Sequence, residues 1–371
     1  MKTLLWNGDL NQAARDLLSW LLKEGFIKGA LVHMALPRYR SFVPALTRDL
    51  EAIAQSWPAP PLMAHQMALV VSRMTIRGPV GQSIAVVLRP CEMAALRELV
   101  KLRQAHLDGL LTIGLDCPGV ISLKVWQKGD RKTLLETFLR RPEELIGYRP
   151  SCKMCLHQAG EGFDLVLGSL GFPSGKTALL AFSPRGEEIL SRSPGEAGDL
   201  LSRTEALDGL RAERQAQREK QLGDLYQRFS GADGLLDFFS SCINCHSCMR
   251  VCPICYCRQC FFDSPAFEGS ADNYLRRARR KNGLRLPSDM LLFHLGRMNH
   301  MSLSCVSCGQ CEDACPAGLP IAQLFSLAAQ KSQELFNYRP GRSLTDPLPF
   351  SVYQEEELKE VEAPYRDIWH P

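Results

Sequence analysis

The chain has 371 residues, of which 45% are hydrophobic, with a net charge of +4 and fifteen cysteines. This length is enough for one full-sized domain and a smaller one, and the small charge excess does not indicate nucleic-acid binding. The first residues lack the apolar core of a signal peptide, and no apolar stretch approaches the roughly 20 residues that a transmembrane helix needs. We therefore expect a cytoplasmic protein without direct membrane insertion, whose cysteines stay reduced or bind metal.

The N-terminal third has the periodicity of an α/β domain. Residues 10–25 have the apolar spacing of an amphipathic helix, and residues 30–34 follow as a strand. Residues 83–88 and 110–115 are apolar, and residues 92–104 between them have helical periodicity. This pattern predicts a β-α-β unit with parallel strands.

Four cysteines are placed near the expected edge of that sheet. Cys91 and Cys117 each follow a predicted strand, at the edge where open α/β sheets bind ligands. Cys152 and Cys155 form a C-x2-C pair further along. Four thiolates are enough for one 4Fe-4S cluster, but Cys91 and Cys117 could equally be small buried residues, as free cysteines often are. Spacing alone does not decide between the two.

The middle of the chain contains no further catalytic signal. Residues 168–177 imitate the end of a phosphate-binding P-loop, but the required glycine is replaced by Leu170, and residues 177–182 have the pattern of a strand. We expect a hairpin turn there. Residues 205–229 mix charged and apolar side chains, which predicts a solvated helix joining two domains, with no catalytic role.

Two copies of the run C-x2-C-x2-C-x3-C-P follow. Runs of this kind hold 4Fe-4S clusters in bacterial ferredoxins, where the fourth cysteine of each run binds the other cluster. The spacing therefore predicts an electron carrier with two sets of ligands: Cys242, Cys245, Cys248 and Cys315 for one cluster, and Cys305, Cys308, Cys311 and Cys252 for the other. The alternative is zinc, which normally takes two C-x2-C pairs separated by a longer spacer.

Three more cysteines exceed those eight ligands. Cys255, Cys257 and Cys260 could belong to a further metal site, act as alternative ligands or be buried thiols. His294 and His300 flank the second run, and we expect them to pack near a cluster or to donate a hydrogen bond to its sulfur.

The remaining segments predict surface structure. The basic residues at 276–281 indicate a solvated helix face, with docking of a partner as a second interpretation. Residues 323–335 have a helical pattern, and residues 337–371 are rich in Pro and Glu, which predicts a tail that wraps the surface or reaches a neighbouring subunit.

Several of these motifs together resemble the beta subunits of deazaflavin-dependent hydrogenase and formate dehydrogenase. The resemblance is carried by LRPCE at residues 88–92, GLDCPG at 114–119, the C-x2-C pair followed by DLVLG at 164–168, FHLGRM at 293–298 and the two cysteine runs. The C-terminal block is similar to formate dehydrogenase beta subunits in particular. The likeness extends from about residue 10 to about residue 330.

In that family, four scattered cysteines bind a 4Fe-4S cluster beside an FAD, and the flavin exchanges a hydride with the deazaflavin coenzyme. The resemblance therefore implies that Cys91, Cys117, Cys152 and Cys155 bind a further 4Fe-4S cluster, and that FAD is present. Family members usually open with a Gly-rich turn near the cofactor, whereas residues 11–14 here are Asn-Gln-Ala-Ala. Close approach of the backbone to a pyrophosphate generally needs glycine, so the start of the chain does not support the flavin.

We therefore predict an α/β flavin and iron-sulfur domain at residues 1–204, a helical linker at 205–235, an α+β two-cluster ferredoxin-like domain at 236–330 and an extended C-terminal tail at 331–371. The resemblance implies an electron-transfer subunit of a multi-subunit oxidoreductase. It would pass electrons between a hydride carrier, either deazaflavin or nicotinamide, and a formate dehydrogenase, hydrogenase or heterodisulfide-reductase-type partner. The alternatives are a flavin-free electron wire that carries only 4Fe-4S clusters and a zinc-bound structural module.

Overall fold

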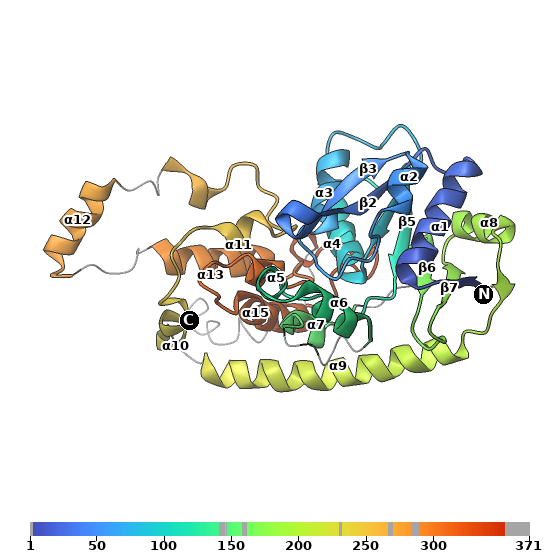
Figure 1. Cartoon of the computed structure of the whole chain (residues 1–371). Helices are drawn as coiled ribbons and strands as arrows, with labels where there is room; N and C mark the ends of the chain where they lie inside the picture. The colour runs from blue at the N-terminus through green and yellow to red at the C-terminus, as the bar shows by residue number, and fades with distance from the viewer. Residues whose placement is uncertain are drawn as a thin grey trace, which may run out of the picture.

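The computed structural model describes residues 3–140, 145, 147–157, 162–229, 232–265, 270–283 and 289–352 (Figure 1). Its strands are β1 (Thr3–Asn7), β2 (Gly29–Leu36), β3 (Ser41–Thr47), β4 (Ile84–Leu88), β5 (Leu110–Leu115), β6 (Leu165–Gly168), β7 (Lys176–Ala181) and β8 (Glu196–Ala197). Its helices are α1 (Leu10–Lys23), α2 (Leu50–Ala54), α3 (Met67–Thr75), α4 (Pro90–Lys101), α5 (Leu123–Lys128), α6 (Arg131–Arg140), α7 (Pro150–Lys153), α8 (Pro184–Arg192), α9 (Leu201–Arg228), α10 (Ala232–Phe239), α11 (Ser247–Arg250), α12 (Ala271–Arg280), α13 (Asp289–Met301), α14 (Gln310–Asp313) and α15 (Ile321–Leu335).

All the strands of the described residues form one mixed sheet, in the order β3-β2-β4-β5-β6-β7-β1-β8. The four central strands β2, β4, β5 and β6 are parallel, and the strands at both ends pair in the antiparallel direction. The predicted β-α-β unit is confirmed, since β4 and β5 are parallel neighbours joined through α4. The turn that imitates a P-loop is confirmed as a hairpin, since β6 pairs with β7 in the antiparallel direction.

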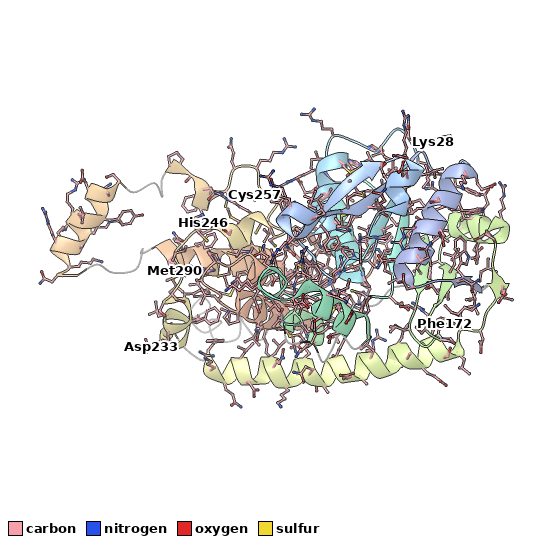
Figure 2. The ribbon with its side chains drawn as sticks, viewed as in Figure 1. Lys28, Phe172, Asp233, His246, Cys257 and Met290 are labelled. Atoms are coloured by element: carbon pink, nitrogen blue, oxygen red, sulfur yellow. The ribbon has the colours of Figure 1, made fainter. Side chains whose placement is uncertain are left out.

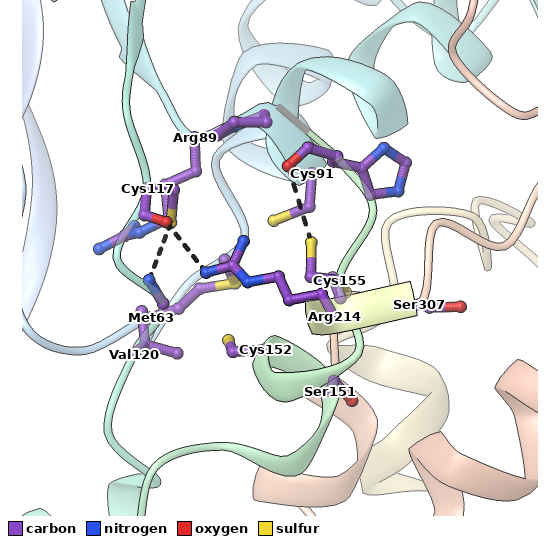
Figure 3. A pocket seen from close by; sticks show the side chains of 14 residues that line it. Met63, Arg89, Cys91, Cys117, Val120, Ser151, Cys152, Cys155, Arg214 and Ser307 are labelled. Atoms are coloured by element: carbon purple, nitrogen blue, oxygen red, sulfur yellow. Dashed lines mark hydrogen bonds between the residues drawn. The ribbon is translucent and has the colours of Figure 1, made fainter. Parts of the chain in front are cut away.

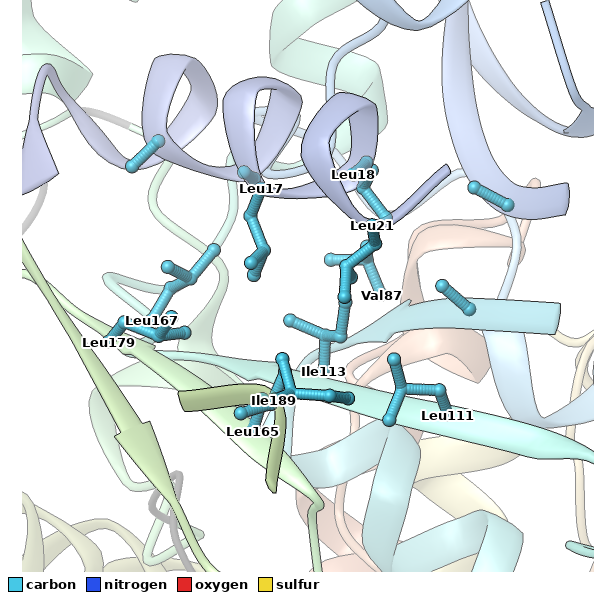
Figure 4. Close-up of a cluster of buried hydrophobic side chains, with 14 of the residues drawn as sticks. Leu17, Leu18, Leu21, Val87, Leu111, Ile113, Leu165, Leu167, Leu179 and Ile189 are labelled. Atoms are coloured by element: carbon cyan, nitrogen blue, oxygen red, sulfur yellow. The ribbon is translucent and has the colours of Figure 1, made fainter. Parts of the chain in front are cut away.

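Alternation along the strands divides the apolar core between the two faces of the sheet. Leu165 and Leu167 of β6 pack on one face with Leu17 and Leu21 of α1 (Figure 4). Val166, between them in sequence, lies on the opposite face in the cluster that includes side chains of α3 and α4. Helices therefore cover both faces, which leaves the carboxyl ends of the parallel strands as the edge where functional side chains can gather.

Helix α9 connects the sheet to the C-terminal part and runs along one side of the molecule toward α10 (Figure 1). Most of its residues are exposed or half-buried, as its charged sequence predicts. Three of its residues are nevertheless buried: Arg203 against Asp116, Arg214 against the Cys117 carbonyl and the Tyr148 hydroxyl, and Leu222 against Met154 and Leu327. The predicted solvated helix is thus also a packing element.

The C-terminal part differs from its predicted class. An α+β arrangement is expected for residues 236–330, but the described residues of this range form helices and short loops and no strand. The physical reason lies in the segment between the two cysteine runs: instead of alternating β-branched residues it carries the helical patterns of α12 and α13. The described part of this second region is therefore all-helical, with a core around Phe239, Phe293 and Phe325.

Helix α12 carries the basic cluster and has no buried residue, which confirms a solvated helix face. Figure 1 shows it standing apart from the rest of the molecule. Helix α15 runs to Leu335, past the predicted start of the tail at residue 331. The division of the chain into domains stays a prediction.

The described part of the tail, up to residue 352, packs on α4. Glu98 is fully buried there and pairs with Lys101 at 2.7 Å. The Tyr338 hydroxyl donates to both Glu98 oxygens at 2.7 and 2.8 Å, and the Gly341 amide donates to Oε1 at 2.8 Å. Residues 353–371 of the predicted tail lie outside the described residues.

We expect Tyr338→Phe to loosen this segment. The change removes a donor from a buried carboxylate, a hydrogen bond that typically contributes about 1.5–3 kcal/mol. Limited proteolysis under argon should cut residues 337–352 faster in the variant, while Tyr226→Phe, at an exposed tyrosine, should behave as wild type. Equal cleavage rates in all three proteins would show that the Glu98 contacts do not hold the tail.

Candidate metal centres

The first group of functional side chains lies at the carboxyl edge of β4 and β5. Strand β4 ends at Leu88, and α4 begins at Pro90, so that Cys91 stands in the first turn of the helix. Proline suits this first position because it has no N–H to leave unpaired. Strand β5 ends at Leu115, and Cys117 follows two residues later. Because the two strands are parallel neighbours, both cysteines emerge at the same edge.

The loop that carries Cys117 is fixed at both ends. Asp116 is buried and forms an ion pair with Arg203 of α9 at 2.6 Å. Gly119 has a φ of +97°, and a Cβ there would meet the ring and hydroxyl of Tyr148. Glycine is therefore required by the positive φ and by the close approach of the tyrosine. Both features position the Cys117 sulfur, which accepts a hydrogen bond from the Gly119 amide at 3.4 Å.

The C-x2-C pair comes from the short helix α7 and the residues after it. Cys152 lies within α7, and Cys155 follows its end. Arg149, immediately before the helix, is buried and donates to the Met63 carbonyl at 3.3 Å and to the Cys308 carbonyl at 3.0 Å. It also pairs with Asp313 of α14. These contacts hold α7 between the sheet edge and the second cysteine run.

The structure brings these four predicted cysteines together around one small cavity of about 20 Å³. Figure 3 shows Cys91, Cys117, Cys152 and Cys155 arranged about this space, with Arg214 of α9 reaching toward it. Arg214 donates to the Cys117 carbonyl at 3.4 Å. We call these four cysteines the sheet-edge set.

The two C-terminal runs share a backbone conformation at equivalent positions, in keeping with their common cysteine spacing. In the first run Asn244 and His246 have φ values of 54° and 58°, and in the second run the corresponding Ser307 and Gly309 have 52° and 78°. Each run then enters a one-turn helix, α11 or α14, that carries its third cysteine. Residues with positive φ bend each loop back on itself, so that the cysteines of one run can face a common centre.

The structure also brings together the two crosswise sets predicted from the ferredoxin pattern. One cavity of about 20 Å³ is lined by Cys242, Cys245, Cys248 and Cys315, which we call the distal set. Another of about 20 Å³ is lined by Cys252, Cys305, Cys308 and Cys311, which we call the middle set. In both, the fourth cysteine comes from the other run.

The three sets lie in a row. Ser307 and Cys308 line both the sheet-edge cavity and the middle cavity, so these two spaces are neighbours. Arg297 of α13 interacts electrostatically with Cys248 of the distal set and with Cys252 and Cys311 of the middle set. The middle set is therefore flanked by the other two.

Burial keeps most of these thiols protonated when nothing is bound. It raises the pKa of Cys152 to about 12, of Cys308 to about 12 and of Cys248 to about 11. Metals bind the thiolate, so loading the sets must release protons. Cys252 is different, because a hydrogen bond from the Cys255 side chain lowers its pKa to about 6.

The other cysteines and histidines fall outside the three sets. Cys255 lies beside Cys252, with its sulfur 2.8 Å from the Met301 sulfur, and Cys257 is exposed (Figure 2). His294 is buried, with Nε2 at 3.3 Å from the Cys242 sulfur, whereas His300 is exposed on the same helix. Among the described residues, no group of three or more His, Cys, Asp or Glu side chains is placed to hold a single metal ion.

The start of α1 does not fit a pyrophosphate. Asp9 caps this helix by accepting a hydrogen bond from the Gln12 amide at 2.9 Å, so a carboxylate occupies the position where an anion would bind. The Asn11 side chain accepts from the Ala59 amide at 2.8 Å. A different, wider hollow of about 400 Å³ lies beside α9 and is lined by Arg211, Arg339 and Leu156, next to Cys155.

Sequence reasoning missed the buried cations around the sets. Arg214 falls in a helix predicted to be solvated and without a role, and no local signal marks it. Arg149 directly precedes Pro150 and the C-x2-C pair, and Arg297 lies in a motif quoted for the family resemblance, so their positions could have identified them.

The C-terminal part of the chain matches a known family of iron-sulfur domains. Residues 238–319 match the family model of the 4Fe-4S dicluster domain. Together with the paired cysteine runs, this match makes the chain an iron-sulfur protein of the electron-transfer class. None of the described helices is long and apolar enough to cross a bilayer.

Two relatives carry the comparison further. The chain is 26% identical to "F420-dependent formate dehydrogenase subunit beta" of Methanocaldococcus jannaschii, across 73% of this chain and 77% of the relative. It is 25% identical to "F420-dependent formate dehydrogenase 1 subunit beta" of Methanococcus maripaludis, across 91% of this chain and 92% of the relative. The resemblance predicted from the motifs is thereby confirmed: the chain is similar to proteins named as beta subunits of an oxidoreductase, F420-dependent formate dehydrogenase.

A solved structure described as "Xenon derivatization of the F420-reducing [NiFe] hydrogenase complex from Methanosarcina barkeri" contains a chain with 15% identity and a TM-score of 0.44. The match covers 60% of this chain and 93% of that one.

Proposed function

We propose that the chain is the iron-sulfur subunit of a multi-subunit formate dehydrogenase or a related oxidoreductase, with three 4Fe-4S clusters held by the sheet-edge, middle and distal sets. The observation that carries this proposal is the grouping of twelve cysteines into three adjoining sets of four. The curated relatives, which are named as formate dehydrogenase subunits, support the partner class. Hydrogenase and heterodisulfide-reductase-type partners are the alternatives.

The donor chemistry of each set fits a 4Fe-4S cluster, which takes four thiolates. When bound, such clusters supply one-electron transfer. The chain's own contribution is to keep the sets side by side: Arg149 links α7 of the sheet-edge set to Cys308 and Asp313 of the second run. A row of this kind suits transfer between a donor at one end of the subunit and an acceptor at the other.

We include FAD in the proposal as the group that exchanges a hydride with the carrier, either deazaflavin or nicotinamide. A flavin can split the two electrons of a hydride into single electrons, chemistry that belongs to the cofactor. Its place would be the hollow beside α9, which is lined by the carboxylate of Asp208 and by Arg211 and Arg339, the two cationic side chains that would bind the phosphates.

A second candidate is a flavin-free electron wire with the same three clusters. The carboxylate of Asp9 at the start of α1, where the family resemblance leads us to expect a glycine-rich turn, favours it. In this reading the chain accepts single electrons directly and contacts no hydride carrier.

Anaerobic purification followed by metal analysis and an absorbance spectrum separates these functions. We expect about twelve iron atoms per chain. We also expect flavin absorption bands, from a flavin that denaturation releases into solution. Iron without flavin would support the electron wire. Zinc without iron would overturn both and leave the zinc-bound structural module. Copurification of a formate dehydrogenase catalytic subunit with the intact chain would test the partner.

A further inference from the structure

Helix α13 places a row of unusual side chains between the distal and middle sets. His294, Arg297 and Met301 recur at intervals of three and four residues, so they lie on one face of the helix. His294 and Arg297 are 0% and 2% exposed, although both are polar. Burial of such groups is costly unless they find partners, and here the partners are sulfur atoms of cysteines.

His294 is placed to donate a hydrogen bond to the Cys242 sulfur when that sulfur is a metal-bound thiolate, which can only accept. Its ring stacks on Phe239 with centroids 4.0 Å apart, and its Nε2 lies 3.3 Å from the Cys242 sulfur. The other ring nitrogen, Nδ1, is buried and has no partner among the described residues. A proton on Nδ1 would be a buried donor without an acceptor, so the favoured tautomer carries its proton on Nε2 and donates it to the sulfur.

Arg297 brings a positive charge between the distal and middle sets, and its hydrogen bonds go to Cys248 of the distal set. Its Nη1 donates to the Cys248 sulfur at 3.0 Å, and its Nη2 donates to the Cys248 carbonyl at 3.2 Å. The guanidinium lies over the Phe325 ring, 4.7 Å from the centroid. No carboxylate of the described residues forms an ion pair with it, so the negative charge that balances it must come from the cysteine sulfurs and what they bind.

The middle set differs in its side-chain donors. Backbone amides donate to sulfurs of both sets, as from Asn244 to Cys242 in the distal set and from Ser307 to Cys305 and Gln310 to Cys308 in the middle set. Within the described part of the chain, no side-chain nitrogen donates to a sulfur of this set. The two ferredoxin-type sets therefore share one cysteine spacing but differ in the side-chain donors around them.

We propose that His294 and Arg297 are tuning residues that make the distal cluster easier to reduce than the middle cluster. This proposal rests on the cluster assignment of the proposed function. Hydrogen bonds to the sulfurs stabilise the extra negative charge of a reduced cluster, which raises its reduction potential. The Arg297 charge acts on the sulfurs of both sets, whereas the hydrogen bonds of His294 and Arg297 go to sulfurs of the distal set, so these hydrogen bonds separate the two clusters. Electrons would then collect at the distal end of the row, so that end is the one a partner's acceptor should approach.

Redox titration of the whole anaerobic chain, followed by electron paramagnetic resonance, tests the proposal. His294→Phe keeps the aromatic stack on Phe239 and removes the donor. We expect it to lower the equilibrium constant for reducing the distal cluster at least tenfold, equivalent to 59 mV for one electron, with a smaller change at the middle cluster. His300→Phe, at an exposed histidine of the same helix, should leave both potentials unchanged. Cys245→Ser identifies which signal belongs to the distal set.

Arg297 is tested by a pair of changes. Arg297→Gln removes a charge that acts on both sets, so it should lower both potentials, the distal one more because Cys248 also loses its hydrogen bond from Arg297. Arg297→Lys, which keeps the charge and an N–H donor, should restore most of the loss. If the Arg297→Gln variant loses iron, its potentials cannot be compared with those of the wild type, and the His294→Phe variant alone tests the proposal. The proposal is overturned if the His294→Phe variant retains all its iron and its distal cluster keeps the wild-type reduction potential. It is also overturned if the reduction potentials of the distal and middle clusters change by the same amount. Absence of any cluster signal in the wild-type chain would instead refute the proposed function.

Discussion

Replacing Cys91 with serine should remove about a third of the iron from the anaerobically purified chain, because one of three four-iron clusters loses a ligand. Cys91 lies in the first turn of α4, and its backbone position is already set by Pro90 and by Glu92, which accepts a hydrogen bond from the Arg89 amide at 2.8 Å. The substitution therefore removes the sulfur and leaves the helix start in place.

The matched control is Cys257→Ser, at an exposed cysteine outside the three sets. Its iron content should equal that of the wild type, and the resonance signals of the middle and distal clusters should persist in both variants. Iron per chain that does not change in Cys91→Ser would show that the sheet-edge set does not hold a cluster. Cys91→Ala provides a second test, because alanine offers no oxygen that could replace the sulfur.

Much of the fold follows from local pattern. The strand at residues 110–115 is predicted and observed with the same limits, because a short apolar run between turn residues suits a buried parallel strand. The cysteine spacing likewise predicts the middle and distal sets, since a loop of two-residue intervals constrains where its thiols can point. These features depend on residues that are close in sequence.

Other features depend on contacts between distant residues. Arg214 has no signal in its own helix, and its role follows from the Cys117 carbonyl and the Tyr148 hydroxyl, which lie far from it in sequence. The α+β class predicted for residues 236–330 is wrong because ferredoxin spacing says nothing about the structure of an insertion. Nor could spacing show that Ser307 and Cys308 would line the sheet-edge cavity.

The ion pair between Arg149 and Asp313 holds the second cysteine run against the sheet-edge set, so breaking this pair should have a large effect. Arg149 is 1% exposed and its guanidinium is held by Asp313, by the Cys308 carbonyl and by the Met63 carbonyl. Removing one partner of a buried ion pair typically costs about 3–5 kcal/mol, because the other charge is left without compensation in the interior. Asp313→Asn should therefore strongly lower the melting temperature of the anaerobic protein.

The control is the pair Arg342–Asp346, whose side chains are 44% and 19% exposed, so that Arg342→Gln should cost only about 0.2–1 kcal/mol and barely move the melting temperature. The double change Arg149→Met with Asp313→Leu should recover part of the loss, since apolar side chains leave no buried charge behind. If Asp313→Asn melts like the Arg342 control, the ion pair does not join the two parts. We expect Asp313→Asn to melt early and the double variant to regain stability. Weaker magnetic coupling between the sheet-edge and middle clusters in the double variant would then show that Arg149 also holds these two sets side by side.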